Sequence, residues 1–156
     1  ATLSDALATG EIAAIVAARQ PTSAKTSSDV IRLIPDYRAA EQAYFAKTGI
    51  FPIMHTLVIR DAVYNENPWI AKSLFNAFEA SKARAAELLA YTGALVSMTP
   101  WLHDAVDEMN EIFSGDAWPY GLEANRRHLE TFTRYLVEEG FLPEAPGLDE
   151  IFVSVE

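Results

Sequence analysis

Two short apolar runs constrain the fold of this chain more than any other feature. Residues 12–18 are apolar on both faces of an extended backbone, and the run ends at Arg19-Gln20-Pro21, where proline breaks a strand ladder. Residues 50–60 are rich in β-branched side chains and too short and too interrupted for a helix. Both runs predict buried strands, which occur in sheets whose two faces are covered by helices. The expected fold class is therefore α/β.

Helix signals account for most of the remaining chain. Thr2 and Asp5 have the spacing of a capping pair, with Gly10 as the stop, and Asp36 is expected to cap a helix over residues 37–47. Three longer helices are predicted: one opened by Asn67-Pro68 and ended by Gly93, one opened by Thr99-Pro100 and running to about Phe113, and one from about Glu123 to Glu139. Residues 22–30 are polar and predict a loop.

The predicted strands are too few for the sheet that their apolar character requires. Two or three strands stand against five helices, and two strands alone do not make a sheet covered on both faces. We therefore expect the other strands to lie in sequence outside these 156 residues. By itself, this stretch should be poorly stable or should self-associate, so assembly of several copies stays an open alternative.

Charge and composition exclude several classes of function. The chain has 12 basic and 22 acidic residues, a net charge of −10, which disfavours binding to nucleic acid or to anionic membranes. It has no cysteine and hence no disulfide or thiolate chemistry. No apolar stretch is long enough for a transmembrane helix, and the N-terminal residues do not have the pattern of a secretory leader.

Four segments resemble one known family. Residues 31–60 (IRLIPDYRAAEQAYFAKTGIFPIMHTLVIR), 67–82 (NPWIAKSLFNAFEASK) and 118–140 (WPYGLEANRRHLETFTRYLVEEG) resemble the 4,5-dihydroxyphthalate decarboxylase family. Residues 10–21 (GEIAAIVAARQP) resemble a shorter pattern of the same family. The likeness covers nearly the whole chain, in order, and falls on the second half of family members.

The resemblance implies a fold and a division into lobes. The family is similar to type 2 periplasmic binding proteins, which have two α/β lobes joined by crossing strands, with the ligand in the cleft between them. Residues 1–30 would end the second lobe, and residues 31–156 would return to the first lobe and complete it. The present chain would then be a helix-rich part with few strands, and the N-terminal half of the same protein would supply the rest.

The resemblance also implies an activity. It favours a cytoplasmic lyase that removes carbon dioxide, without oxidation, from a hydroxylated aromatic carboxylate bound in the cleft. The alternative is a periplasmic solute-binding receptor of an ABC importer for a small carboxylate or aromatic ligand, because one architecture serves both functions. The cofactor requirement is unknown. Nothing in the sequence requires a cofactor, and the use of a divalent metal ion stays an open alternative.

Arg19 and Ser23 follow the first predicted strand. Ligands of open α/β sheets bind beyond the carboxyl ends of strands, and a guanidinium there could hold a carboxylate through two parallel hydrogen bonds. The resemblance favours this role for Arg19 over that of a surface arginine at a strand end. Ser23 could add a hydroxyl donor, and the alternative for it is a solvated loop residue.

His55 lies in the middle of the second predicted strand. Aromatic decarboxylation needs a proton at the ring carbon that loses carbon dioxide, and histidine can deliver one near neutral pH. The alternative is a core histidine whose hydrogen bonds are satisfied. His103 and His128 are expected on solvated helix faces. The sequence contains no His-x-x-x-His or Glu-x-x-His pair, so no metal ligand is assigned.

Aromatic residues mark a turn before the last long helix. Trp118 and Tyr120 could line a pocket for an aromatic ring, and the alternative is a packing plug between a loop and a helix. Arg38, in the helix after the polar loop, could face the cleft. These residues complete the candidate set for substrate binding: Arg19, Ser23, Arg38, Trp118 and Tyr120.

Overall fold

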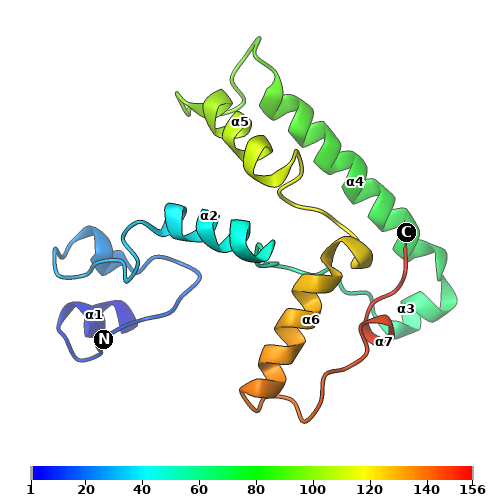
Figure 1. The fold of residues 1–156 in the computed structure, drawn as a ribbon, viewed down its shortest axis with the longest axis horizontal. Helices are drawn as coiled ribbons and strands as arrows, with labels where there is room; N and C mark the ends of the chain where they lie inside the picture. The colour runs from blue at the N-terminus through cyan, green and yellow to red at the C-terminus, as the bar shows by residue number, and fades with distance from the viewer. Residues whose placement is uncertain (1, 156) are drawn as a thin grey trace. The chain divides into compact units, whose positions relative to one another are not determined.

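The described residues are helical wherever they have regular secondary structure. The computed structural model describes residues 2–155 and is 54% helical, with no strand among those residues. The expectation of a helix-rich chain is thus confirmed. In order the elements are α1 (Leu3–Ala8), the 3-10 helix η1 (Thr22–Lys25), α2 (Tyr37–Thr48), α3 (Asp61–Glu66), α4 (Trp69–Ala90), α5 (Leu102–Phe113), α6 (Leu122–Glu138) and α7 (Leu148–Ile151), and Figure 1 shows them.

Local signals in the sequence set the helix ends. The Asp5 N–H donates to Thr2 Oγ1 at 3.2 Å, and the Thr2 N–H donates to Asp5 Oδ2 at 2.9 Å, so the predicted capping pair is present. Asp36 Oδ1 accepts from the Ala39 N–H at 3.4 Å at the start of α2. Pro68 precedes the first residue of α4, where a missing N–H costs no helical hydrogen bond.

The two predicted strands are not formed among the described residues. Residues 12–18 and 50–60 belong to no helix or sheet, and most of their side chains are exposed, including Val16 and Val58. The prediction that they are buried strands is therefore wrong for this chain on its own. The physical reason is that a strand is stabilised by ladder hydrogen bonds to a neighbour, and no described segment lies beside either run as such a neighbour.

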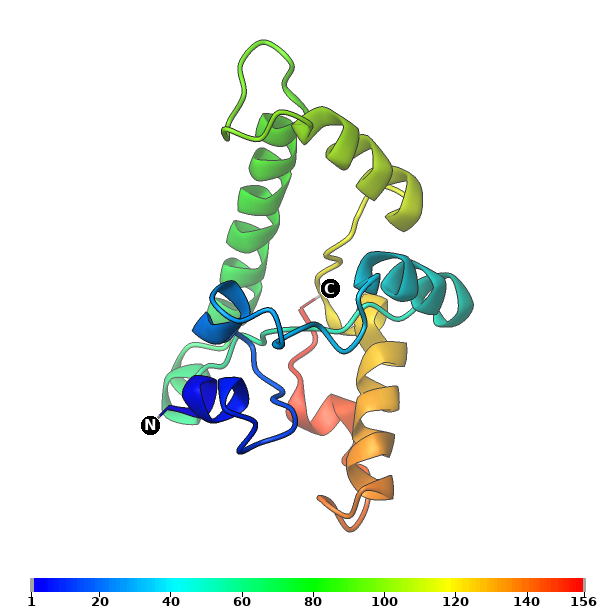
Figure 2. The same cartoon turned by 90° about the vertical axis from the view of Figure 1, so that its left-hand side faces the viewer.

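The structure divides into two compact units, one within residues 2–48 and one within residues 49–155. In the first, η1 packs against α1, and the Ser4 hydroxyl joins them. In the second, α5 turns back against α4, and α7 lies beside α6 (Figure 2). The Arg126 guanidinium of α6 contacts Asp149 of α7 at 3.0 Å. The predicted lobes, 1–30 and 31–156, refer to a longer protein and stay a prediction.

Very little of the chain is buried. The buried apolar residues are mostly small: Ala6, Ala71, Val106, Ala117, Leu122 and Leu148. The accessible surface is 12302 Å² for 17.2 kDa. A compact protein of this mass exposes roughly 7,800 Å², and two separate compact domains sharing it would expose roughly 9,000 Å². Much apolar surface is therefore exposed to solvent. None of the described helices is both long and apolar enough to cross a membrane.

Candidate functional site

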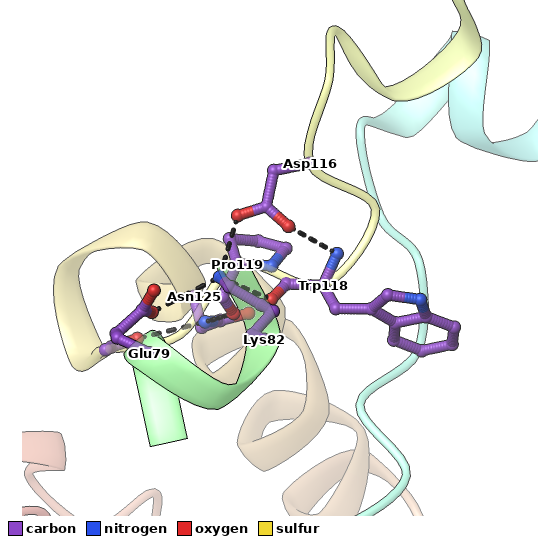
Figure 3. A network of polar contacts seen from close by, with 7 residues as sticks. Glu79, Lys82, Asp116, Trp118, Pro119 and Asn125 are labelled. Carbon is purple, nitrogen blue, oxygen red and sulfur yellow. Dashed lines mark hydrogen bonds and ion pairs between the residues drawn. The ribbon is translucent and has the colours of Figure 1, made fainter. Parts of the chain in front are cut away.

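Lys82 lies at the centre of a polar network that joins α4 to the turn before α6. Its ammonium donates to Asp116 Oδ2 at 2.9 Å and to the Trp118 carbonyl oxygen at 3.1 Å, and it pairs with Glu79 Oε1 at 3.2 Å. Asp116 Oδ1 in turn accepts from the Trp118 N–H at 2.9 Å. Figure 3 shows this arrangement, with the indole of Trp118 pointing away from the ammonium.

The charge of Lys82 is compensated where it lies. Partial burial alone would lower the pKa of Lys82, but its hydrogen bonds to Asp116 and Glu79 outweigh that effect and raise the pKa. The ammonium also lies 4.4 Å from the centroid of the Tyr120 ring, a cation–π distance. Two carboxylates and a carbonyl oxygen contact the Lys82 ammonium. It therefore serves to hold the turn rather than to attract an anionic ligand.

The aromatic turn is fixed on its other sides as well. Phe51 packs edge-on against Trp118, with ring centroids 5.3 Å apart, and against Phe113 at 5.1 Å. The Asn125 side-chain amide donates to the carbonyl oxygens of Pro119 at 2.7 Å and Gly121 at 2.9 Å. Trp118 and Tyr120 thus both make packing contacts, and each keeps part of its ring exposed. Whether that exposed part contacts a substrate stays a prediction.

The network gives a testable expectation for stability. Replacing Lys82 by methionine keeps most of the aliphatic stem but removes three charge-assisted contacts, so we expect the free energy of unfolding to fall by about 1–2 kcal/mol. Arg84→Met is the matched control on the same helix. Arg84 and Glu87 are both highly exposed and form an i,i+3 pair at 2.9 Å, whose loss should change stability by at most about 0.5 kcal/mol. Urea denaturation of the two variants checks this, and equal losses would show that the network adds no more than a surface ion pair.

The candidates in the first unit have different surroundings. Ser23 is buried, and its hydroxyl accepts from the Ser4 hydroxyl at 3.0 Å, while its N–H donates to the same Ser4 oxygen at 2.9 Å. Its observed contacts therefore tie η1 to α1. Arg19 is exposed in a bend before η1, and Arg38 is exposed in the first turn of α2.

His55 is exposed on the segment without regular secondary structure that precedes α3. Of the predicted site residues, the structure brings Trp118 and Tyr120 together around Lys82. Arg19, Ser23 and Arg38 belong to the first unit, whereas His55, Trp118 and Tyr120 belong to the second. The candidates are therefore divided between the two units.

Two residues of interest had not been included in the candidate site from the sequence. Lys82 could have been noticed because it follows Glu79 by three residues on a helix, a spacing typical of ion pairs. His128 was expected on a solvated face but is half-buried, and its Nδ1 atom has no hydrogen-bond partner among the described residues. Partial burial, with a smaller contribution from Arg127, lowers the pKa of His128.

Within residues 2–155, no group of three or more histidine, aspartate or glutamate side chains is arranged to hold a metal ion.

Comparison with known proteins relates most of the chain to a curated protein. No protein-family model matches the chain. The chain is 31% identical over 132 residues to a protein named 4,5-dihydroxyphthalate decarboxylase from Comamonas testosteroni. The aligned region covers 84% of this chain and 40% of that protein, so the matched part of the chain spans less than half the length of the curated relative. The match supports a relation to the 4,5-dihydroxyphthalate decarboxylase family, in agreement with the resemblance stated above.

Proposed function

We propose that this chain forms part of a carboxy-lyase that removes carbon dioxide, without oxidation, from a hydroxylated aromatic carboxylate. The observation that carries the proposal is the 31% identity to the decarboxylase, which extends over 84% of the chain. An alignment of that extent indicates common ancestry of this region. The substrate proposed first is 4,5-dihydroxyphthalate, because the relative's name specifies it.

The chemistry defines what the protein must supply. A ring hydroxyl ortho or para to the reacting carbon donates electron density, so that carbon can take up a proton. The bond to the carboxylate then breaks, its electron pair returns to the ring, and carbon dioxide leaves. The site needs a cation to hold a carboxylate and an acid to deliver the proton. We assign the first role to Arg19, and the second to His55 as proton donor or as the residue that orients one.

The proposed setting is a two-lobed fold like that of type 2 periplasmic binding proteins, with the substrate between the lobes. Residues 1–30 would belong to the second lobe and residues 31–156 to the first. The rest of both lobes would come from sequence outside this chain, equivalent to the region of the relative that the alignment does not cover. Arg38, Trp118 and Tyr120 are proposed to line the cleft. Ser23 is the weakest of this set, because its hydroxyl is already bonded to Ser4. The proposed compartment is the cytoplasm.

The test is carbon dioxide release from 4,5-dihydroxyphthalate by the full-length natural protein that contains this sequence. Stoichiometric carbon dioxide and a dihydroxybenzoate product support the lyase. Thermal stabilisation by the ligand without any product would favour the alternative, a solute-binding receptor. If the protein shows no turnover and no stabilisation with this substrate, 4,5-dihydroxyphthalate is removed from the proposal.

A further inference from the structure

The turn before α6 carries two partly exposed aromatic rings that one side chain of α4 contacts. Trp118 and Tyr120 expose 48% and 41% of their surfaces. The Lys82 ammonium donates to the Trp118 carbonyl oxygen at 3.1 Å (Figure 3). The same ammonium lies 4.4 Å from the centroid of the Tyr120 ring. Lys82 thus fixes the backbone at one aromatic residue and the ring of the other.

The Lys82 ammonium is itself held by carboxylates. Asp116 Oδ2 accepts from it at 2.9 Å, and Glu79 Oε1 lies 3.2 Å away. The other Asp116 oxygen accepts from the Trp118 N–H at 2.9 Å, so the same carboxylate holds both the cation and the turn. Because the charge of Lys82 is compensated by these partners, a ligand at the turn would meet the surfaces of the rings and not an unpaired cation.

Aromatic rings that are held in place are suited to a planar aromatic ligand. Two aromatic rings attract each other in offset or edge-on arrangements, in addition to the effect of the area that they bury. Binding to a ring that is already positioned costs less conformational entropy than binding to one that must first be ordered. A saturated ring of similar size lacks the attraction between rings. The contacts of Lys82 therefore favour aromatic over saturated ligands.

We propose that Lys82 is a positioning residue that sets the preference for aromatic over saturated dicarboxylates by holding Trp118 and Tyr120 in place. The proposal rests on the proposed function, which places these two rings in the cleft. It concerns the selection between ligands and not the chemical step. Lys82 acts through the two aromatic residues and does not itself contact the ligand.

Calorimetric titration of the full-length protein with two dicarboxylates tests the proposal. Phthalate has the aromatic ring but lacks the hydroxyls that decarboxylation needs, and cis-cyclohexane-1,2-dicarboxylate is its saturated counterpart. The natural protein is expected to bind phthalate more tightly. Lys82→Met should weaken phthalate binding about 3- to 10-fold and leave binding of the saturated compound within about twofold, since contacts between aromatic rings contribute an effect of that size.

Three further variants separate positioning from a general loss of structure. Lys82→Arg keeps the charge, the donors and the attraction to an aromatic ring, so it should restore most of the phthalate affinity. Arg84→Met is the matched control on α4 and should change neither affinity. If Lys82→Met is insoluble, Asp116→Asn, which removes a charged partner of Lys82, should reduce the preference for phthalate in the same direction. Equal weakening of both compounds, or an unchanged preference, would overturn the proposal.

Failure of the proposed function gives a different result. A preference for phthalate that depends on Lys82, without carbon dioxide release from 4,5-dihydroxyphthalate, would support the positioning role and remove only the activity. Carbon dioxide release with a preference that does not depend on Lys82 would leave the lyase and overturn the positioning role. Binding of neither dicarboxylate by the natural protein would also overturn it.

Discussion

Replacing His55 by alanine in the full-length protein is expected to lower turnover of 4,5-dihydroxyphthalate about a hundredfold or more, because general acid catalysis by a positioned side chain contributes that much. Substrate affinity should survive, since the imidazole acts on the proton and does not hold the carboxylates. The measurement is kcat from carbon dioxide release, together with the Kd of the substrate. A selective loss in kcat identifies a role in the chemical step.

His103→Ala is the matched control. His103 lies near the start of α5 and is also a histidine outside any assigned metal site, so its loss should leave kcat within a few-fold of the natural enzyme. Unchanged turnover in His55→Ala would remove His55 from the mechanism. A melting temperature lowered to the same extent in both variants, with parallel losses of activity, would indicate a structural effect instead.

Replacing Arg19 by alanine is expected to raise KM about 10- to 100-fold, with a smaller change in kcat. Hydrogen bonds to a charged partner contribute roughly 1.5–3 kcal/mol, and the guanidinium is proposed to make two of them to one substrate carboxylate. Arg19→Lys should recover only part of the affinity, since an ammonium keeps the charge but lacks the planar pair of donors.

The comparison residue for Arg19 is Arg84, which is exposed on α4 and pairs only with Glu87 among the described residues. Arg84→Ala should leave KM unchanged. If Arg19→Ala bound substrate as well as the natural protein does, the carboxylate would be held elsewhere, and Arg38 would be the next residue to replace. Because Arg19 is exposed in the structure, its loss should not affect stability, so a change in KM can be assigned to binding.

Helices were predictable from the sequence because their signals are local. The Thr2 and Asp5 pair, Asp36 before α2 and Pro68 before α4 each act within one turn of the helix that they start. The long helices appeared close to their predicted bounds for the same reason. Such interactions do not depend on residues far away in the chain.

The predicted strands are not formed among the described residues because a strand is not a local structure. The apolar character of residues 12–18 and 50–60 indicates burial, but it cannot say which segment does the burying. Val16 and Val58 are among the most exposed apolar residues of the described chain. The apolar pattern therefore identified segments that need neighbouring strands to be buried. It did not show that such a sheet is formed.

The candidate site could be predicted only in part from the sequence. The turn at Trp118 and Tyr120 was recognised from its aromatic residues, and its packing against Phe51 agrees with the alternative of a plug. Lys82 was missed because its partner Asp116 and the Trp118 carbonyl oxygen lie more than thirty positions further along the chain. Contacts of that separation depend on the fold. The roles of Arg19 and His55 stay predictions, which the alanine variants test.

The most direct measurement is decarboxylation by the full-length protein in D₂O, with the product analysed by mass spectrometry and NMR. Protonation of the ring carbon that loses carbon dioxide predicts one molecule of carbon dioxide per dihydroxybenzoate and one deuterium at that carbon. Bound substrate returned unchanged after prolonged incubation, or a product with altered oxidation level, would contradict the assignment of this chain to a non-oxidative aromatic decarboxylase.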